Sequence, residues 1–299
     1  MSDSSSALQL AIAQLAEHTA ASGYIAEPGL LTNLWLMTEL GRPLLLEGDA
    51  GVGKTQLGKT MAEVLDRELI RLQCYEGLDV STAVYEWNYQ RQLISIRRSE
   101  SSGDKQLSEA DLFSDEYLLR RPLLQAISSE KPTVLIIDEI DRADEEFEAF
   151  LLELLSEFQV SIPELGTMRA KSLPAVILTS NGTRELSDAL RRRCLYHYID
   201  FPNYEKELSI VKTRIPEIND RLASQLVAFV QSIRKEDLRK VPGIAETLDW
   251  TAAMLKLNVT SLAESPEAVL ATLGCLLKTR EDHDAMPEVT VQKLINRAS

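Results

Sequence analysis

The stretch LLLEGDAGVGKTQLGKT, residues 44–60, constrains the fold of this chain more than any other. It passes from an apolar, strand-like run into a glycine-bearing turn and then into a helical pattern. This is the context in which the spacing GxxxxGK(S/T) forms a phosphate-binding loop. Glycines let backbone N–H groups approach phosphate oxygens, and the helix start adds its positive end. The predicted nucleotide contacts are Gly48, Asp49, Ala50, Gly51, Val52, Gly53, Lys54, Thr55 and Gln56.

Four side chains have the chemistry that hydrolysis of ATP requires. Lys54 would reach the β- and γ-phosphates as a cation, and the Thr55 hydroxyl would be a ligand to Mg²⁺. Asp138 and Glu139 end the apolar run at residues 133–137, which is typical of a strand buried on both faces. Asp138 is the candidate magnesium carboxylate. Glu139 projects to the other side of the strand and could polarise the attacking water.

Two further positions leave alternatives open. Asn181 follows the next apolar strand, where its amide could orient the same water, but asparagine before Gly182 is also common in ordinary turns. Residues 191–193 are all arginine and end a short helical pattern. They could be structural, since a cation at a helix C-terminus gains about 0.3–1 kcal/mol. One of them could instead reach a γ-phosphate, a contact worth about 10³- to 10⁵-fold in rate.

The strand patterns stop near residue 201, and only helical patterns follow. The first part has five predicted strands with helical or mixed crossovers, which favours a parallel α/β sheet. We therefore expect an α/β nucleotide-binding domain at residues 1–203, opening with two helices separated at Ser22-Gly23, and a small all-helical lid domain at 204–299. The predicted lid helices lie near residues 204–213, 219–236, 245–257, 266–278 and 287–297.

Several connecting segments have distinct compositions. The aromatic residues of the segment 74–93 could form a surface for a partner or could simply pack inside. Residues 95–116 are polar and rich in serine, which predicts a mobile surface loop, and residues 117–127 return to helical periodicity. Residues 158–172 predict a hairpin with its tip at 163–166.

Charge and composition argue against some classes of function. The 32 basic and 46 acidic residues give a net charge of −14, which weighs against broad attraction to nucleic acid or anionic membranes. Asp3 stands where a secretory signal would carry basic residues, and no apolar run approaches the roughly 18 residues that cross a bilayer. The three cysteines have neither zinc-site nor disulfide-framework spacing. We expect a cytoplasmic protein without membrane insertion.

The motifs GDAGVGKT, LIIDE, LTSN and ALRRRC, in this order before a helical tail, resemble those of AAA+ ATPases. The stretches GRPLLLEGDAGVGKT, RLQCYEGLD, AVYEWNYQRQL, SIPELGTMRA and AETLDW are similar to the MoxR family, and within it to the branch that includes the carbon monoxide dehydrogenase accessory ATPase CoxD. The resemblance covers most of the chain and is weakest at residues 95–116 and after Asp249.

The resemblance implies an AAA+ P-loop NTPase fold with ATP and Mg²⁺. It also implies roles for the motif residues: Lys54 and Thr55 as the Walker A pair, Asp138 and Glu139 as the Walker B pair, Asn181 as sensor 1, and Arg193 as the arginine finger with Arg192 in reserve. Because that finger acts across a subunit boundary, the family implies a ring, usually a homo-hexamer. Residues 74–94 correspond to the family's helix 2 insert and residues 158–172 to a second insert.

The lid departs from the family pattern. MoxR-like lids usually carry a sensor 2 arginine at the start of a helix, where this chain has Ala245 and Glu246. Arg239 or Lys240 could substitute for it.

The implied task is chaperone-like maturation or activation of a client enzyme complex, including metal-cofactor insertion, alongside a von Willebrand factor A domain protein. Two alternatives remain open. A motor acting on nucleic acid would need a basic channel, and a nucleotide-gated scaffold with little turnover would not need the intact Glu139.

Overall fold

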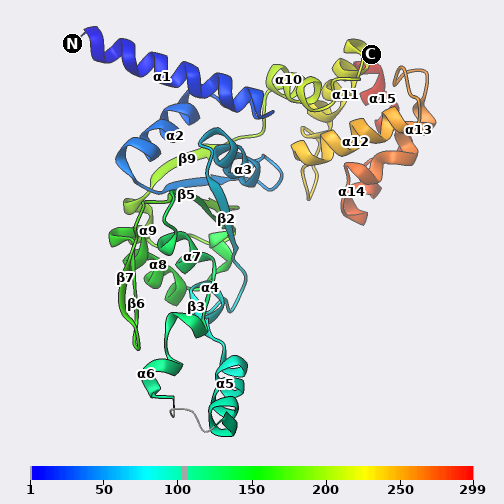
Figure 1. Cartoon of the computed structure of the whole chain (residues 1–299). Helices are drawn as coiled ribbons and strands as arrows, with labels where there is room; N and C mark the ends of the chain where they lie inside the picture. The colour runs from blue at the N-terminus through cyan, green and yellow to red at the C-terminus, as the bar shows by residue number, and fades with distance from the viewer. Residues whose placement is uncertain (1, 103–106, 299) are drawn as a thin grey trace. The chain divides into compact units, whose positions relative to one another are not determined.

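The computed structural model describes residues 2–102 and 107–298 (Figure 1). Contacts divide the described chain into two compact units. The first consists of the chain up to Ile12, Pro28–Glu47 and Met61–His197, and the second of Ala13–Glu27, Gly48–Thr60 and the chain from Tyr198 onward. The phosphate loop therefore belongs to the same unit as the helical tail. The boundary expected after residue 203 stays a prediction.

The N-terminal helices are α1, Ser2–Ala21, and α2, Pro28–Leu40, which confirms the predicted break at Ser22-Gly23. Gly23 has a φ of 75°, a left-handed conformation that glycine adopts without a Cβ penalty just past a helix end. Pro28 is the first residue of α2, where its fixed φ suits a helix start. Within the first unit, α2 packs against a strand of the sheet, β8.

Five strands form the main sheet in the order β2-β5-β8-β1-β9, which confirms the predicted parallel α/β fold. They are β1 Leu44–Gly48, β2 Glu68–Gln73, β5 Thr133–Asp138, β8 Ala175–Ser180 and β9 Leu195–Ile199. In the parallel register, Ile137 pairs with Leu178 and Gln73 with Asp138. Since parallel strands end at one edge of the sheet, Asp138 and the residues that follow Ser180 meet there.

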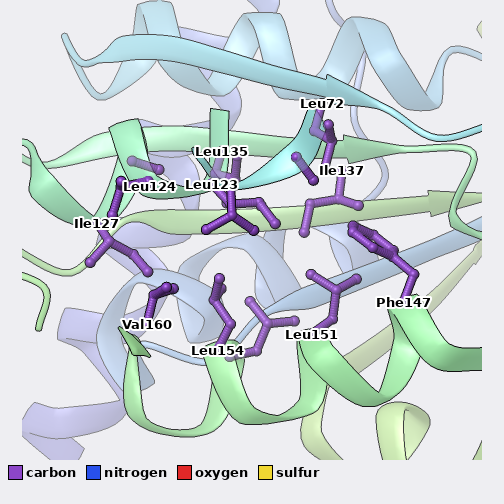
Figure 2. Packing of buried hydrophobic residues seen from close by; sticks show 14 of the residues in the cluster. Leu72, Leu123, Leu124, Ile127, Leu135, Ile137, Phe147, Leu151, Leu154 and Val160 are labelled. Atoms are coloured by element: carbon purple, nitrogen blue, oxygen red, sulfur yellow. The ribbon is translucent and has the colours of Figure 1, made fainter. Parts of the chain in front are cut away.

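One face of the sheet packs on α7, Pro122–Ser128, and α8, Glu145–Glu157. Figure 2 shows Phe147, Leu151 and Leu154 of α8 turned toward Leu135 and Ile137 of β5. All five side chains are buried, and each such burial is worth about 1.5–3 kcal/mol. Alternation along β5 sends Asp138 to the face opposite Ile137. The core thus fixes the direction of the carboxylate.

The segment after β2 is more ordered than expected. It contains α4 Val80–Ala83, β3 Tyr85–Trp87, α5 Tyr89–Ser102, α6 Glu109–Leu112, the 3-10 turn Asp115–Tyr117 and β4 Leu118–Arg120. The predicted mobile loop at residues 95–116 is therefore wrong at 95–102 and 109–112, and residues 103–106 lie outside the described part. A capping box between Ser108 and Asp111 starts α6. The helix predicted at 117–127 is wrong at 118–120, because these residues pair antiparallel with β3.

The aromatic residues of this segment divide between the two alternatives. Trp87 is buried and meets Phe113 edge to face, with ring centroids 5.1 Å apart. Tyr75 and Tyr89 are exposed. Packing thus explains Trp87 and leaves Tyr75 and Tyr89 on the surface.

The hairpin and the short arginine helix appear as predicted. The hairpin strands β6, Gln159–Ile162, and β7, Gly166–Arg169, pair antiparallel. A 3-10 turn, Ile140–Arg142, follows β5, and α9, Asp188–Arg193, carries the arginine run. The helix that follows the phosphate loop is α3, Lys54–Val64.

The tail contains α10 Tyr204–Arg214, α11 Asp220–Ile233, α12 Ile244–Lys256, α13 Pro266–Thr272, the 3-10 turn Leu273–Cys275, α14 Arg280–Asp284 and α15 Glu288–Ala298. The helix expected at 266–278 ends early, and the short α14 was not predicted. Thr279 caps α14 through the backbone N–H of Asp282. The Asp282 carboxylate in turn accepts hydrogen bonds from the backbone of Arg239 and Lys240. No helix of the described chain combines the length and apolarity needed to cross a membrane.

Candidate functional site

The phosphate loop lies in the second unit and depends on close backbone approaches. A Cβ on Gly48 would lie 2.3 Å from the carbonyl oxygen of Ile199, so only glycine fits there. Gly51 has a φ of 80° and Gly53 one of 98°, both conformations that L side chains rarely adopt. The ring of Tyr24, which the sequence reasoning missed, lies beside Gly53.

The Lys54 side chain turns back over this loop. Its Nζ donates hydrogen bonds of 2.7 Å to the backbone carbonyls of Gly48 and Asp49, and the residue is buried. An ammonium buried in this way keeps its charge only with such partners. The loop thus holds a positive charge beside the backbone amides that the spacing predicted for phosphate.

The loop is bonded to the first turn of α12 within the second unit. The backbone N–H of Ile244 donates to the Gly51 carbonyl at 2.9 Å. A Cβ on Gly243 would lie only 2.8 Å from the Gly51 Cα. The Glu246 carboxylate accepts from the Gly243 N–H at 3.0 Å and caps the helix. The start of α12, where the sequence resemblance implied an arginine, therefore holds a capping acid.

A cavity of about 460 Å³ lies between this loop and the helical tail, lined mainly by residues of its connecting segments. Residues 49–51 line one side, and Arg239, Lys240 and Lys278 supply three cationic side chains. Glu246 also lines it. Arg239 and Lys240, either of which could substitute for a sensor 2 arginine, thus share a cavity with the loop, and their contact with nucleotide stays a prediction.

The Walker B candidates lie in the first unit, at the end of β5. Asp138 is buried, and its Oδ1 accepts a 2.5 Å hydrogen bond from the Thr179 hydroxyl. The same hydroxyl accepts from the Glu139 backbone N–H at 2.9 Å. Thr179 of β8 therefore ties the two acids together. Sequence reasoning missed it, although its place at the end of the neighbouring apolar strand was a usable signal.

Each acid also pairs with an arginine that the sequence reasoning missed. Asp138 Oδ2 accepts from Arg71, and Glu139 Oε2 lies 2.8 Å from Nε of Arg142. Glu139 has a φ of 55°, uncommon for a residue with a side chain. It follows the strand rather than belonging to it. A left-handed turn, not strand alternation, is therefore what directs the two carboxylates differently.

A buried thiol lies beside these acids. Burial first, and then the charges of Asp138, Asp141 and Glu139, raise the pKa of Cys74 to about 12. The thiol therefore stays protonated near neutral pH and does not serve as a nucleophile.

Asn181 follows β8 in a segment held by Asp141. Asp141 Oδ2 accepts from the Thr183 backbone at 3.0 Å and from its hydroxyl at 2.6 Å. Burial alone would raise the pKa of Asp141, but these bonds and one from the Asn181 backbone hold that pKa below its ordinary value. Because the pKa is lowered in the folded chain, this stabilisation is present at neutral pH. It is lost as the pH falls through the lowered value.

The three arginines of α9 have different surroundings. Arg191 forms a 2.7 Å ion pair with Glu47 and lies over the Tyr196 ring, which indicates a structural role. Arg193 is exposed and donates to the Ser156 hydroxyl at 2.6 Å. Arg192 is also exposed, and its carbonyl accepts from Arg42. Arg193 and Arg192 thus stay the predicted finger and its reserve.

Mixing two inactive variants tests the finger. We expect Arg193→Ala and Glu139→Gln to be inactive alone and to recover activity when mixed. In a ring, about a quarter of the interfaces would then be intact at equal mixing, since each needs one subunit of each kind in a fixed order. ATP turnover measures the recovery, and Arg192→Ala is run in parallel. If neither arginine variant complements Glu139→Gln in intact rings, a finger acting between subunits is contradicted.

A glycine-rich phosphate loop entering a helix, together with an Asp-Glu pair after a buried parallel strand, defines a P-loop nucleoside triphosphatase. The family model "AAA domain (dynein-related subfamily)" matches residues 43–194, more than half of the chain. The chain belongs to this family.

Curated proteins of similar sequence include two gas vesicle ATPases. The gas vesicle ATPase GvpN of Haloferax mediterranei is 28% identical over 213 residues, covering 67% of this chain, and GvpN1 of Halobacterium salinarum is 27% identical over the same length. The aligned region spans 58% of each of these relatives. An uncharacterised Staphylococcus aureus protein is 24% identical, with 83% of this chain and 89% of that protein covered.

A mutant form of Thermotoga maritima RuvB is similar in structure, with a TM-score of 0.52 at 17% sequence identity. The match covers 84% of this chain and 70% of RuvB. This likeness shows the fold alone.

Proposed function

We propose that the chain uses ATP hydrolysis to remodel a client protein, as a chaperone-like ATPase of the MoxR type. The task would be maturation or activation of a client enzyme complex, including insertion of a metal cofactor, together with a von Willebrand factor A domain partner. The active form would be a homo-hexameric ring. The sequence resemblance supports this proposal, and the two gas vesicle ATPases are relatives of the same broad class. The CoxD branch and the cytoplasmic location stay predictions.

One observation carries the proposal: the phosphate loop is hydrogen-bonded to the helical lid. The bond from Ile244 to Gly51 links the loop directly to the start of α12. A change in the loop on nucleotide binding or hydrolysis would therefore reach a helix whose far side packs in the lid core, through Trp250 and Met254. Such coupling is what a remodeller requires, because the energy of hydrolysis has to move a protein element.

The chain's own residues fit the chemistry. Lys54 would bind the β- and γ-phosphates, Glu139 would take the proton of the attacking water, and Asn181 would orient that water. Asp138 and the Thr55 hydroxyl are hard oxygen donors of the kind that magnesium prefers. Asp138 already holds a cationic group, Arg71, which shows that this buried carboxylate binds positive charge. Bound Mg²⁺ would neutralise the charge that develops on the phosphates.

The loop-to-lid bond can be tested at Gly243. We expect Gly243→Ala to push the start of α12 away from Gly51, at a cost of about 1–3 kcal/mol in the free energy of unfolding. In the parent chain, ATP should increase the protection of the α12 backbone amides from hydrogen exchange, and in Gly243→Ala this increase should be lost. Gly274→Ala is the matched control, because a Cβ there meets no atom within 4 Å. Protection that survives in Gly243→Ala would contradict the coupling.

The variant Glu139→Gln can be used to identify the client, because it should bind ATP without hydrolysing it. Expressed in the native host, this variant should retain the client and the von Willebrand factor A domain protein in an ATP-dependent way. The control is the same variant with Lys54→Ala added, which should not bind ATP. Retention of identical proteins by both forms, or of none by either, would contradict the remodelling proposal. ATP-dependent retention of nucleic acid would favour a nucleic-acid motor instead.

The two alternatives have less support. A nucleic-acid motor would have to bind a polyanion with a chain of net charge −14. A scaffold with little turnover would leave the pair Asp138-Glu139, fixed by Thr179, without a chemical role.

A further inference from the structure

The candidate magnesium carboxylate is paired with an arginine from the neighbouring strand. Arg71 lies on β2, an edge strand whose Gln73 is in register with Asp138. Paired residues of parallel strands point to the same face, and so do residues two apart, so Arg71 shares the face of Asp138. Its Nε lies 3.0 Å from Asp138 Oδ2, and its Nη2 also donates to that oxygen. Gln73 Oε1 accepts from the same Nη2 at 2.6 Å.

The two partners differ in their ability to move. The Asp138 side chain is 3% exposed, whereas that of Arg71 is 45% exposed. Asp138 is also held through its other oxygen by the Thr179 hydroxyl. The carboxylate is therefore fixed, and the guanidinium can leave it for water with little desolvation cost.

A cation that is already paired with the Asp138 carboxylate would weaken the binding of a second cation to it. Without a positive partner, a carboxylate as buried as Asp138 would carry a large desolvation cost. A magnesium ion that shares the carboxylate would be repelled by a guanidinium about 3 Å from its oxygen. Arg71 and a magnesium ion would thus compete for Asp138.

We propose that Arg71 is a displaceable counter-ion of Asp138, a positioning residue that sets the magnesium concentration at which nucleotide binds. This inference rests on the proposed role of Asp138 in binding magnesium with ATP. Arg71 neutralises Asp138 when magnesium is low and turns toward solvent when magnesium binds. Gln73 steadies the paired state by accepting from the guanidinium.

The test is a magnesium titration of the binding of a fluorescent ATP analogue by the full chain. Arg71→Met keeps the apolar stem and removes the charge. We expect it to lower the half-saturating Mg²⁺ concentration by about fivefold, the fold-change of a contact of about 1 kcal/mol. Affinity for the analogue in excess EDTA should stay unchanged. Arg71→Lys keeps a cation and should stay within about twofold of the parent.

Arg120→Met is the matched control, because Arg120 pairs with Asp115 at an exposed position of the same unit. It should leave the magnesium titration unchanged. If Arg71→Met fails to fold, Gln73→Leu takes its place, since it loosens the guanidinium while keeping Asp138 paired, and its half-saturating Mg²⁺ should fall too. An unchanged or raised magnesium requirement in the folded variant would overturn the inference. A parent chain that binds no nucleotide at any Mg²⁺ concentration would instead contradict the proposed function.

Discussion

Replacing Lys54 by alanine is expected to weaken ATP binding by at least about 100-fold, which corresponds to about 2.7 kcal/mol. Lys54 is the cation of the phosphate loop, and its Nζ is held there by the carbonyls of Gly48 and Asp49. Hydrogen bonds to charged groups contribute about 1.5–3 kcal/mol each, so loss of one phosphate contact accounts for most of this effect. Isothermal titration of the purified chain with ATP measures it.

The control for Lys54→Ala is Lys59→Ala, which removes an exposed lysine from the same helix, α3. Its affinity for ATP should match the parent. Thermal unfolding without nucleotide then separates a lost phosphate contact from a disordered loop, and Lys54→Met, which keeps the stem, should lose affinity to the same degree. Undiminished affinity in folded Lys54→Ala would remove the phosphate-loop assignment.

Features with a strong local cause were predictable from the sequence. The apolar runs that become β5 and β8 are buried on both faces, so their composition reports their environment directly. The phosphate loop was predictable because its spacing between a strand and a helix is a local pattern. The structure adds the reason for the first glycine, since a Cβ on Gly48 would meet the carbonyl oxygen of Ile199. Asp138 and Asn181 became candidate site residues because Asp138 ends β5 and Asn181 directly follows β8, and their roles stay predictions.

The features that the sequence did not reveal depend on register or on weak local patterns. Arg71 reaches Asp138 because β2 and β5 align in one register, which a single strand pattern cannot specify. The pair formed by Arg142 and Glu139 depends on the left-handed conformation of Glu139. Such a conformation is usually predicted from a glycine, and this position has none. The serines and charges of residues 95–102 predict a loop when taken alone. In the structure these residues continue a helix that begins earlier, at Tyr89.

The sequence resemblance implied an arginine at the start of α12, and this chain has none there. The arginines at 191–193 therefore become more important as candidate cations for the nucleotide. At the start of α12, the chain has a capping acid, Glu246, that lines the same cavity as the phosphate loop. An acid there does not neutralise phosphate charge, so the cations have to come from elsewhere. Arg239, Lys240 and Lys278 line the same cavity within the same unit and would be the cations nearest the loop. Arg193 or Arg192 would supply one more from a neighbouring subunit in the proposed ring.

Glu139→Gln is expected to lower kcat for ATP hydrolysis by about 10²- to 10⁴-fold, the usual contribution of a general base. The amide has the same shape but cannot take a proton from water. ATP binding should change little, since Glu139 is proposed to act on the water and not on the nucleotide. The variant should also fold normally. Its pair with Arg142 is partly exposed, and such pairs contribute about 0.2–1 kcal/mol.

Steady-state kinetics separate this role from a binding role. A base that acts only in the chemical step lowers kcat and leaves the ATP dissociation constant in place. Glu153→Gln, at an exposed position of α8, is the matched control and should hydrolyse ATP at the parent rate. Normal turnover by Glu139→Gln would remove Glu139 as the base. A loss of ATP affinity equal to the loss of rate would show instead that the left-handed turn at Glu139 shapes the nucleotide site. The Thr179 hydroxyl connects this turn to Asp138, because it accepts from the Glu139 backbone N–H and donates to the Asp138 carboxylate.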